Sequence, residues 1–96
     1  MKPLDQAQID LALATVPGWQ IERGQLIRQF KFADFIKAIA FVDRIAVLAE
    51  AAGHHPDIDI RYDRVLLTLM THDANGITRK DFSLAAAADR AFVVAT

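Results

Sequence analysis

Hydrophobic and polar positions divide the chain into segments of helical spacing and segments that alternate with a period of two. Helical spacing over residues 4–15 predicts a first helix that ends before Pro17. Its apolar residues are expected near one another: Ile9, Leu11 and Leu13. Residues 19–23 and 26–32 are typical of two strands, and Gly24 permits a tight turn between them. The N-terminal third is therefore expected to be a helix followed by a hairpin.

A second helical pattern covers residues 35–52, where the apolar positions form a wide stripe. The stripe consists of Phe35, Ile39, Val42, Ala46 and Ala49, and it is widened by Phe41, Ile45 and Leu48. Asp34 is placed to cap the start of this helix, and Gly53 is placed to end it in a left-handed conformation. A stripe of this width predicts heavy burial against a sheet and leaves room for a subunit contact.

After Pro56 the alternation has a period of two, which predicts a second pair of strands. Residues 57–62 are expected to form a half-buried strand, and residues 65–72 are the most strand-like run of the chain. Asp63 and Arg64 would form a tight connection between them. The residues expected to share a face are Ile58, Ile60 and Tyr62 in the first strand, and Val65, Leu67, Leu69 and Thr71 in the second.

A turn signal at residues 75–76, an Asn-Gly pair, precedes a final helix that begins at Thr78. Along one side of this helix lie Leu84, Ala88, Ala91, Phe92 and Ala95. The order of elements is thus α-β-β-α-β-β-α. This order predicts an α+β fold, a four-stranded antiparallel sheet with three helices packed on one face. Because no linker or repeat interrupts it, one domain is expected over residues 1–96.

Composition narrows the function classes. The chain has 96 residues with a hydrophobic fraction of 53%, which is enough for one small core. Because a domain of this size buries little apolar surface, contacts between subunits would add stability, and an oligomer is plausible. With 11 basic and 12 acidic residues, no strong field attracts nucleic acid or an anionic membrane. The absence of cysteine excludes disulfides and thiolate metal sites. No apolar run has the length of a signal peptide or a membrane span, so a soluble cytoplasmic protein is expected.

The chain contains three histidines, and two of them form a pair in front of a proline: His54, His55 and Pro56. The proline restricts His55 to extended backbone, so this segment is a stiff joint between helix and strand. His72 lies at the far end of the second predicted strand. If the two strands form a hairpin, the end of one lies beside the start of the other. We therefore expect the three imidazoles to meet at one edge of the sheet.

Three neighbouring imidazoles could serve as acid and base near neutral pH, or they could bind a metal. The simpler interpretation of a His-His pair is that both are polar loop residues, but a third histidine at the same edge favours a functional site. A metal site is less favoured. Asp57 and Asp59 could add oxygen ligands, but neighbouring residues of a strand alternate between its faces, and no HExxH or His-x-His spacing occurs. Four cations are interpreted as solvated residues and not as ligand-binding groups: Arg61, Arg64, Arg79 and Lys80.

Asp81 follows Thr78 by three residues, which is the spacing of a helix capping box. In that arrangement the Thr78 hydroxyl accepts from the Asp81 amide, and the Asp81 carboxylate accepts from the Thr78 amide. A role in the site is compatible with the capping role, because a helix N-terminus near the histidines would place this carboxylate against one of them. Both interpretations stay open at this point.

These spaced residues resemble the signature of the pterin-4a-carbinolamine dehydratase family. The matching positions are Glu50, then His54-His55-Pro56, then Tyr62, His72 and Asp81. The stretches FKFADF, before the second helix, and ITRKDFSLA, at the start of the last, are also similar to the family. The resemblance extends from about Trp19 to the C-terminus and includes several motifs in the same order.

The resemblance implies a hydro-lyase, a 4a-hydroxytetrahydrobiopterin dehydratase that needs neither cofactor nor metal. It would convert 4a-hydroxytetrahydropterin to quinonoid dihydropterin and water during tetrahydropterin recycling. The family's catalytic residues correspond to His54, His55, His72 and Asp81, and these residues with Pro56 would contact the substrate. The expectation for the acid is His55 or His72. His54 would position the substrate or accept a proton, and Asp81 would orient a histidine.

The resemblance also implies a four-stranded antiparallel sheet and assembly as a homodimer or homotetramer, with a functional link to an aromatic amino acid hydroxylase. Two alternatives remain. Some animal relatives double as dimerisation cofactors for a homeodomain transcription factor, so the chain could be a protein-interaction module. It could also bind pterin without catalysis. The physiological pterin, the choice between dimer and tetramer, and the identity of the acid stay open.

Overall fold

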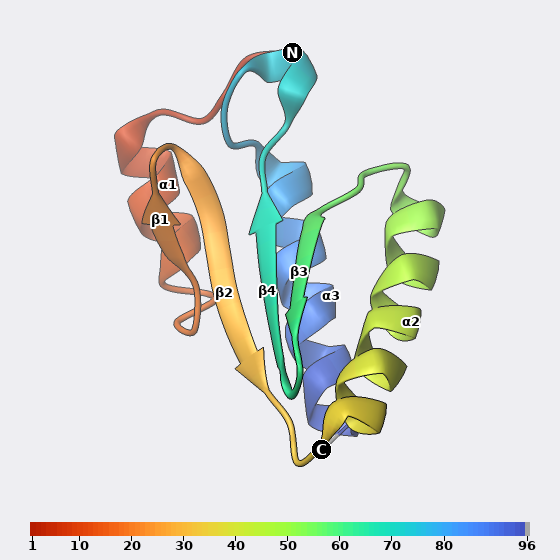
Figure 1. Cartoon of the computed structure of the whole chain (residues 1–96). Helices are drawn as coiled ribbons and strands as arrows, with labels where there is room; N and C mark the ends of the chain where they lie inside the picture. Colours follow the sequence, from red (N-terminus) through yellow and green to blue (C-terminus); the bar gives the residue numbers. More distant parts are fainter. Residues whose placement is uncertain (96) are drawn as a thin grey trace.

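The computed structural model describes residues 1–95, and its elements follow the predicted order. They are α1 (Gln6–Leu13), β1 (Gln20–Glu22), β2 (Gln25–Lys31), α2 (Phe35–Ala52), β3 (Asp57–Arg61), β4 (Arg64–Leu69), a short 3₁₀ helix η1 (His72–Ala74) and α3 (Arg79–Ala95). The strands form one antiparallel sheet in the order β1-β2-β4-β3, with α3 behind β4 and β3, and α1 behind β1 (Figure 1). The predicted fold class is therefore confirmed, although the predicted domain extends to Thr96, which lies outside the described residues.

Alternation along β4 determines which side chains enter the core. Val65, Leu67 and Leu69 are buried, and Thr71 just beyond the strand is buried with them, as predicted. Phe30 of β2 lies at the centre of an aromatic cluster. Its ring centroid is 5.9 Å from that of Trp19, 4.7 Å from Phe41 and 5.1 Å from Phe92. The sheet and the helices thus bury their large rings together, which adds to the apolar burial that stabilises so small a chain.

The ends of α2 are where the sequence placed them. The Asp34 carboxylate accepts a hydrogen bond from the Lys37 amide at 2.8 Å. Gly53 ends the helix with φ +61°, in the left-handed region that favours glycine. The bounds of α2 therefore follow from its capping residues.

None of the helices within residues 1–95 combines the length and the apolar character needed to cross a membrane.

The buried face of α2 differs from the predicted stripe. Phe41, Ile45 and Ala49 are buried as the stripe predicts, and Ala38, outside the stripe, is buried with them. The predicted Phe35 and Ala46 are exposed. Apolar residues occur nearly all round this helix, so periodicity alone did not select a face. The sheet takes the face with Phe41 and Ile45. The same error affects α1, where Leu11 is exposed, while Ile9 and Leu13 are partly buried.

Strand β3 is an edge strand, and the prediction that it is half-buried is wrong. All five of its residues are exposed in the single chain, because β4 pairs with it on one side only and no element covers the other. The connection to β4 also lies one residue earlier than predicted. Arg61 pairs with Arg64, so the turn residues are Tyr62 and Asp63, and Tyr62 has φ +53°. The second strand ends at Leu69, short of the predicted residue 72.

A polar cluster fastens the segment before β1 to α3. The Trp19 indole Nε1 donates to Asp89 Oδ1 at 2.8 Å, and Arg28 Nη1 donates to the same oxygen at 2.7 Å. The Arg28 guanidinium also lies over the Phe30 ring, 4.4 Å from its centroid. The carboxylate neutralises the charge of the guanidinium, and the aromatic ring packs against its planar face.

Candidate active site

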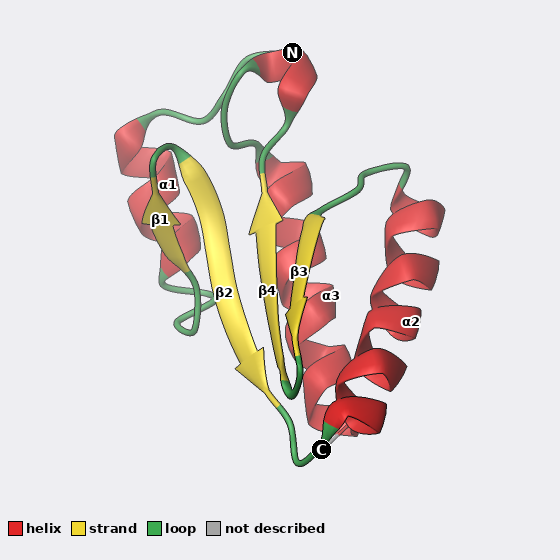
Figure 2. Cartoon of the chain, viewed as in Figure 1, coloured by secondary structure: helices red, strands yellow, loops and turns green. Residues whose placement is uncertain are grey.

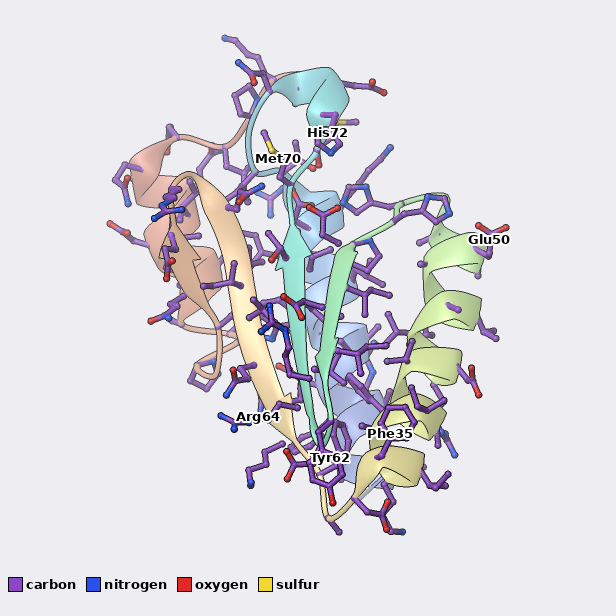
Figure 3. All side chains as sticks on the ribbon, viewed as in Figure 1. Phe35, Glu50, Tyr62, Arg64, Met70 and His72 are labelled. Atoms are coloured by element: carbon purple, nitrogen blue, oxygen red, sulfur yellow. The ribbon has the colours of Figure 1, made fainter. Side chains whose placement is uncertain are left out.

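Two connections meet at one end of the sheet. The first joins α2 to β3 through residues 53–56, and the second leads from β4 through η1 to α3 (Figure 2). Figure 3 shows Glu50, Met70 and His72 at this end of the molecule and Tyr62 and Arg64 at the other. The chain thus brings together segments that are far apart in sequence. This agrees with the prediction, which followed from pairing β3 and β4 in a hairpin.

Both connections contribute to one pocket of about 220 Å³. The lining residues are Gly53, His54, His55, Met70, Thr71, His72, Asp73 and Lys80. All three histidines line this pocket, so the structure brings them together as the sequence predicted. Pro56 is not among the lining residues. His72 belongs to η1 and not to a strand, because the strand pairing ends before it.

His54 is held by a buried carboxylate. His54 Nε2 lies 2.5 Å from Asp81 Oδ1, and the two side chains are 10% and 0% exposed. Asp81 Oδ2 accepts from the Thr78 amide and from Thr71 Oγ1, both at 2.9 Å. An ionised carboxylate can only accept hydrogen bonds, so His54 Nε2 is the donor. This leaves Nδ1 as the nitrogen of His54 that is free to accept a proton.

Asp81 performs the two roles that the sequence left open. Its carboxylate caps the start of α3 at the Thr78 amide, and the same carboxylate contacts His54. The reciprocal half of the capping box is absent. The Asp81 amide bonds to the backbone oxygen of Thr78 at 3.1 Å, and the Thr78 hydroxyl accepts from the Lys80 amide at 3.2 Å instead. The helix N-terminus therefore fixes the position of the carboxylate that holds His54.

His55 has a carboxylate partner in a different environment. His55 Nε2 lies 2.5 Å from Glu50 Oε2, on the last turn of α2, and the side chains are 63% and 77% exposed. Water and salt reach this pair freely, so it holds the ring less firmly than the buried pair does. His72 is also exposed. The pocket therefore combines one imidazole that is only 10% exposed with two that solvent reaches freely.

The site contains three further residues that the sequence analysis did not select as site residues. The alternation predicts only that Thr71 shares a face with the apolar residues of its strand, and its hydroxyl contacts Asp81. Glu50 was noted only as part of the motif, and it pairs with His55. Lys80 is exposed, in agreement with its interpretation as a solvated residue, and it also lines this pocket and, with His54, a neighbouring one of about 150 Å³. The position of Lys80, next to Asp81 at a helix start, was the available signal.

The chemistry open to this pocket is proton transfer. Imidazole gains and loses protons near neutral pH, and two of the three rings here are each hydrogen-bonded to a carboxylate. Within residues 1–95, no three His, Cys, Asp or Glu side chains are grouped so that they could hold a metal ion. A pocket of about 220 Å³ has room for a small heterocycle.

Comparisons with known proteins agree with this arrangement. Residues 2–91 match the family model described as pterin 4 alpha carbinolamine dehydratase. A Chloroflexus aurantiacus protein is 58% identical over 93% of this chain and 96% of its own length. One from Acidobacterium capsulatum is 50% identical over 90% of this chain and 94% of its own length. Both carry the name "Putative pterin-4-alpha-carbinolamine dehydratase".

Two solved structures share the fold. A Brucella melitensis protein, described as a transcriptional coactivator/pterin dehydratase, superposes with a TM-score of 0.91 at 35% identity, over 94% of this chain and 98% of that one. A second, described as a pterin dehydratase-like RuBisCO assembly factor of the alpha-carboxysome, has a TM-score of 0.65 at 27% identity, over 77% of this chain and 86% of that one. With a family model that matches almost the whole length, the chain belongs to the pterin 4 alpha carbinolamine dehydratase family.

Proposed function

We propose that this chain dehydrates 4a-hydroxytetrahydropterin to quinonoid dihydropterin and water, by histidine general acid and base catalysis in tetrahydropterin recycling. One observation carries the proposal: His54, His55 and His72 come from two separate connections and line one pocket. The name of the family supports the substrate class. The enzyme would be a hydro-lyase, and proton transfer by its own side chains supplies the whole reaction.

The reaction needs a proton donor and a proton acceptor. Hydroxide is a poor leaving group, so an imidazolium gives its proton to the 4a-oxygen as the C4a–O bond breaks. The lone pair on N5 forms the new bond to C4a, and water leaves. A base then removes one proton from the resulting cation, which gives neutral quinonoid dihydropterin. One proton is delivered and one is removed, so the catalyst returns to its starting charge.

The contacts of each ring support a division of these tasks. His54 keeps Nε2 on Asp81, which leaves Nδ1 to accept a proton or to position the substrate. His55 and His72 are exposed to solvent, where a ring can exchange protons with water between turnovers. Either of these two is the acid. Asp81 orients His54 from below the pocket and does not itself line it.

The test is an assay with enzymatically generated 4a-hydroxytetrahydropterin. Each of His54, His55 and His72 is replaced by alanine, and dehydration is followed in single turnovers. Loss of a general acid or base costs about 10²-fold or more, so at least the acid and the base should show such a decrease. Arg64→Ala, at the opposite end of the sheet, is the control and should retain the parent rate. Unchanged rates in all three histidine variants would refute the site.

A second candidate function is a protein-interaction module, and two observations favour it. One structural relative is described as a RuBisCO assembly factor. This chain also has a groove of about 550 Å³ between α2 and α3, where Val47 and Val94 are exposed. Histidine variants that lose dehydration but keep a cellular phenotype would support this function. Tight pterin binding by the parent chain without turnover would instead indicate a binding protein that lacks catalysis.

We further propose that the chain assembles with copies of itself. The exposed edge of β3, with Ile58 and Ile60 on one face, supports an association of this kind. Light scattering after size exclusion distinguishes monomer, dimer and tetramer. A cytoplasmic location and a link to an aromatic amino acid hydroxylase stay predictions of the resemblance, and fractionation and co-purification are the experiments that test them.

A further inference from the structure

The hydroxyls of Thr71 and Thr78 lie between the start of α3 and the carboxylate of Asp81. Thr71 Oγ1 is 2.7 Å from Thr78 Oγ1 and 2.9 Å from Asp81 Oδ2. All three residues are buried. The proposed reaction uses His54 and Asp81 but assigns nothing to these two hydroxyls, although burying them is costly unless each is hydrogen-bonded.

Counting protons fixes the direction of this chain of hydrogen bonds. A hydroxyl has one proton to donate, and Thr71 must donate its proton to the carboxylate, which can only accept. The bond between the two threonines therefore runs from Thr78 to Thr71. Thr78 Oγ1 accepts from the Lys80 amide at 3.2 Å. Every donor thus points toward Asp81, and hydrogen bonds aligned in this way polarise one another.

Thr71 also holds the turn that carries His72. Its amide donates to the Gly76 oxygen at 2.8 Å, and its own backbone oxygen accepts from the Ala74 amide at 3.1 Å. These bonds close the loop around η1, in which His72 is the first residue. One residue is therefore in contact with both halves of the pocket: its backbone fixes the His72 turn, and its side chain fixes the partner of His54.

We propose that Thr71 is a positioning residue for the dehydration, acting through Asp81 to hold His54 in one orientation and one tautomer. This inference rests on the proposed function. With the hydroxyl present, Asp81 Oδ2 is held by two donors and Oδ1 faces His54. Without it, the Thr78 amide alone holds Oδ2, and the carboxylate can turn about its terminal bond. Because Asp81 is 0% exposed, water does not replace the lost donor.

Thr71→Val tests the proposal, because it removes the hydroxyl and keeps the shape. Hydrogen bonds to a charged group have strengths that correspond to about 10-fold to 100-fold in rate, so kcat should fall by that factor. KM should change less than kcat, because the hydroxyl that is removed bonds to Thr78 and Asp81 within the protein. Thr71→Ser keeps the hydroxyl and should restore kcat. Thr68→Val is the matched control, since Thr68 lies on β4 outside the pocket and should leave kcat unchanged.

A second readout follows the imidazole directly. ¹⁵N NMR of the parent protein should show neutral His54 with its proton on Nε2, and Thr71→Val should mix the two tautomers. Parent-like kcat in Thr71→Val, a Thr71→Ser variant as slow as Thr71→Val, or a parent His54 protonated on Nδ1 would each overturn the proposal. If Thr71→Val does not fold, the His54 tautomer in the parent spectrum and the kcat of Thr71→Ser test the proposal.

The same measurements separate this inference from the proposed function. A parent protein that does not accelerate dehydration refutes the proposed function, and the ¹⁵N comparison then still decides whether Thr71 holds His54. If the parent is active and Thr71→Val has the same kcat as the parent, only the proposed role of Thr71 is refuted.

Discussion

The two carboxylate–imidazole pairs of the pocket have the same chemistry and opposite surroundings. His54 with Asp81 and His55 with Glu50 are both 2.5 Å apart. In the first pair Asp81 is buried, His54 is 10% exposed, and the Asp81 carboxylate has two further donors. The second pair is largely exposed, and the Glu50 carboxylate has no second hydrogen bond within the described residues. The distance between carboxylate and imidazole therefore does not by itself show whether a pair fixes the ring or whether solvent can replace its hydrogen bond.

Burial explains the difference. A buried carboxylate that loses its partners cannot turn to water, so its contacts are obligatory and its geometry is fixed. An exposed pair exchanges each contact for hydration at little net cost. We infer that the buried pair sets the orientation of the pocket and that the exposed pair leaves His55 able to move.

The largest expected effect is on stability. Asp81→Ala leaves His54, Thr71 and the Thr78 amide without their acceptor, so the free energy of unfolding should fall by about 3–5 kcal/mol. Glu50→Ala is the matched change in the exposed pair and should cost about 0–1 kcal/mol. Urea denaturation measures both. Equal losses would show that burial does not separate the two pairs.

Exogenous imidazole sharpens the comparison at the level of catalysis. The side chain that acts as acid or base should lose about 10²-fold in single-turnover rate when it is replaced by alanine. Imidazole in the buffer should recover part of the rate in His55→Ala or His72→Ala, whichever is slowed, because solvent reaches both positions. His54→Ala should respond less, because the His54 side chain is only 10% exposed and its partner Asp81 is buried. Recovery in His54→Ala alone would reverse the assignment.

Gly53 offers a change that affects both pairs at once. Its φ is +61° and nothing lies within 4 Å of an added Cβ, so Gly53→Ala should cost about 1–2 kcal/mol through backbone strain alone. The strain lies immediately before His54, so kcat should fall as well. Gly24→Ala is the control, with φ +75° and equally open space in the β1–β2 turn. Thermal unfolding should show similar losses in both, and an equal loss of kcat would contradict the prediction.

The smallest effect is a dependence on salt. Glu50→Gln should change the dehydration rate modestly at low ionic strength, and the difference from the parent should vanish near 1 M salt, where the screening length is about 3 Å. Asp81→Asn should differ from the parent at both ionic strengths, because its surroundings exclude ions. Rates measured across a salt series check this, and a salt-independent Glu50→Gln difference would count against an exposed, screened pair.

The sequence predicted features that depend on neighbouring residues. The bounds of α2 followed from Asp34 and Gly53, because capping is decided within one turn. The meeting of the histidines followed from the hairpin, because antiparallel pairing puts the start of β3 next to the end of β4. Asp81 was found because one spacing served both a helix cap and a carboxylate near the pocket.

Features that depend on tertiary packing were missed. The predicted stripe of α2 was too wide. It included the buried Phe41 and Ile45 but also the exposed Phe35 and Ala46, and only the packing against the sheet distinguishes them. The exposure of β3 depends on its place at the edge, which alternation does not reveal. The contact of the Thr71 hydroxyl joins side chains ten residues apart in sequence, and the pattern indicated only which strand face Thr71 shares.

The anchoring of Trp19 to α3 has a practical consequence. It is the single tryptophan of the chain, and its indole is buried with its N–H on Asp89. Its emission therefore reports, without any label, whether the N-terminal segment is seated against the last helix. That signal arises at the indole's own attachment to α3, so it can register loss of the fold while leaving events among the three imidazoles unseen.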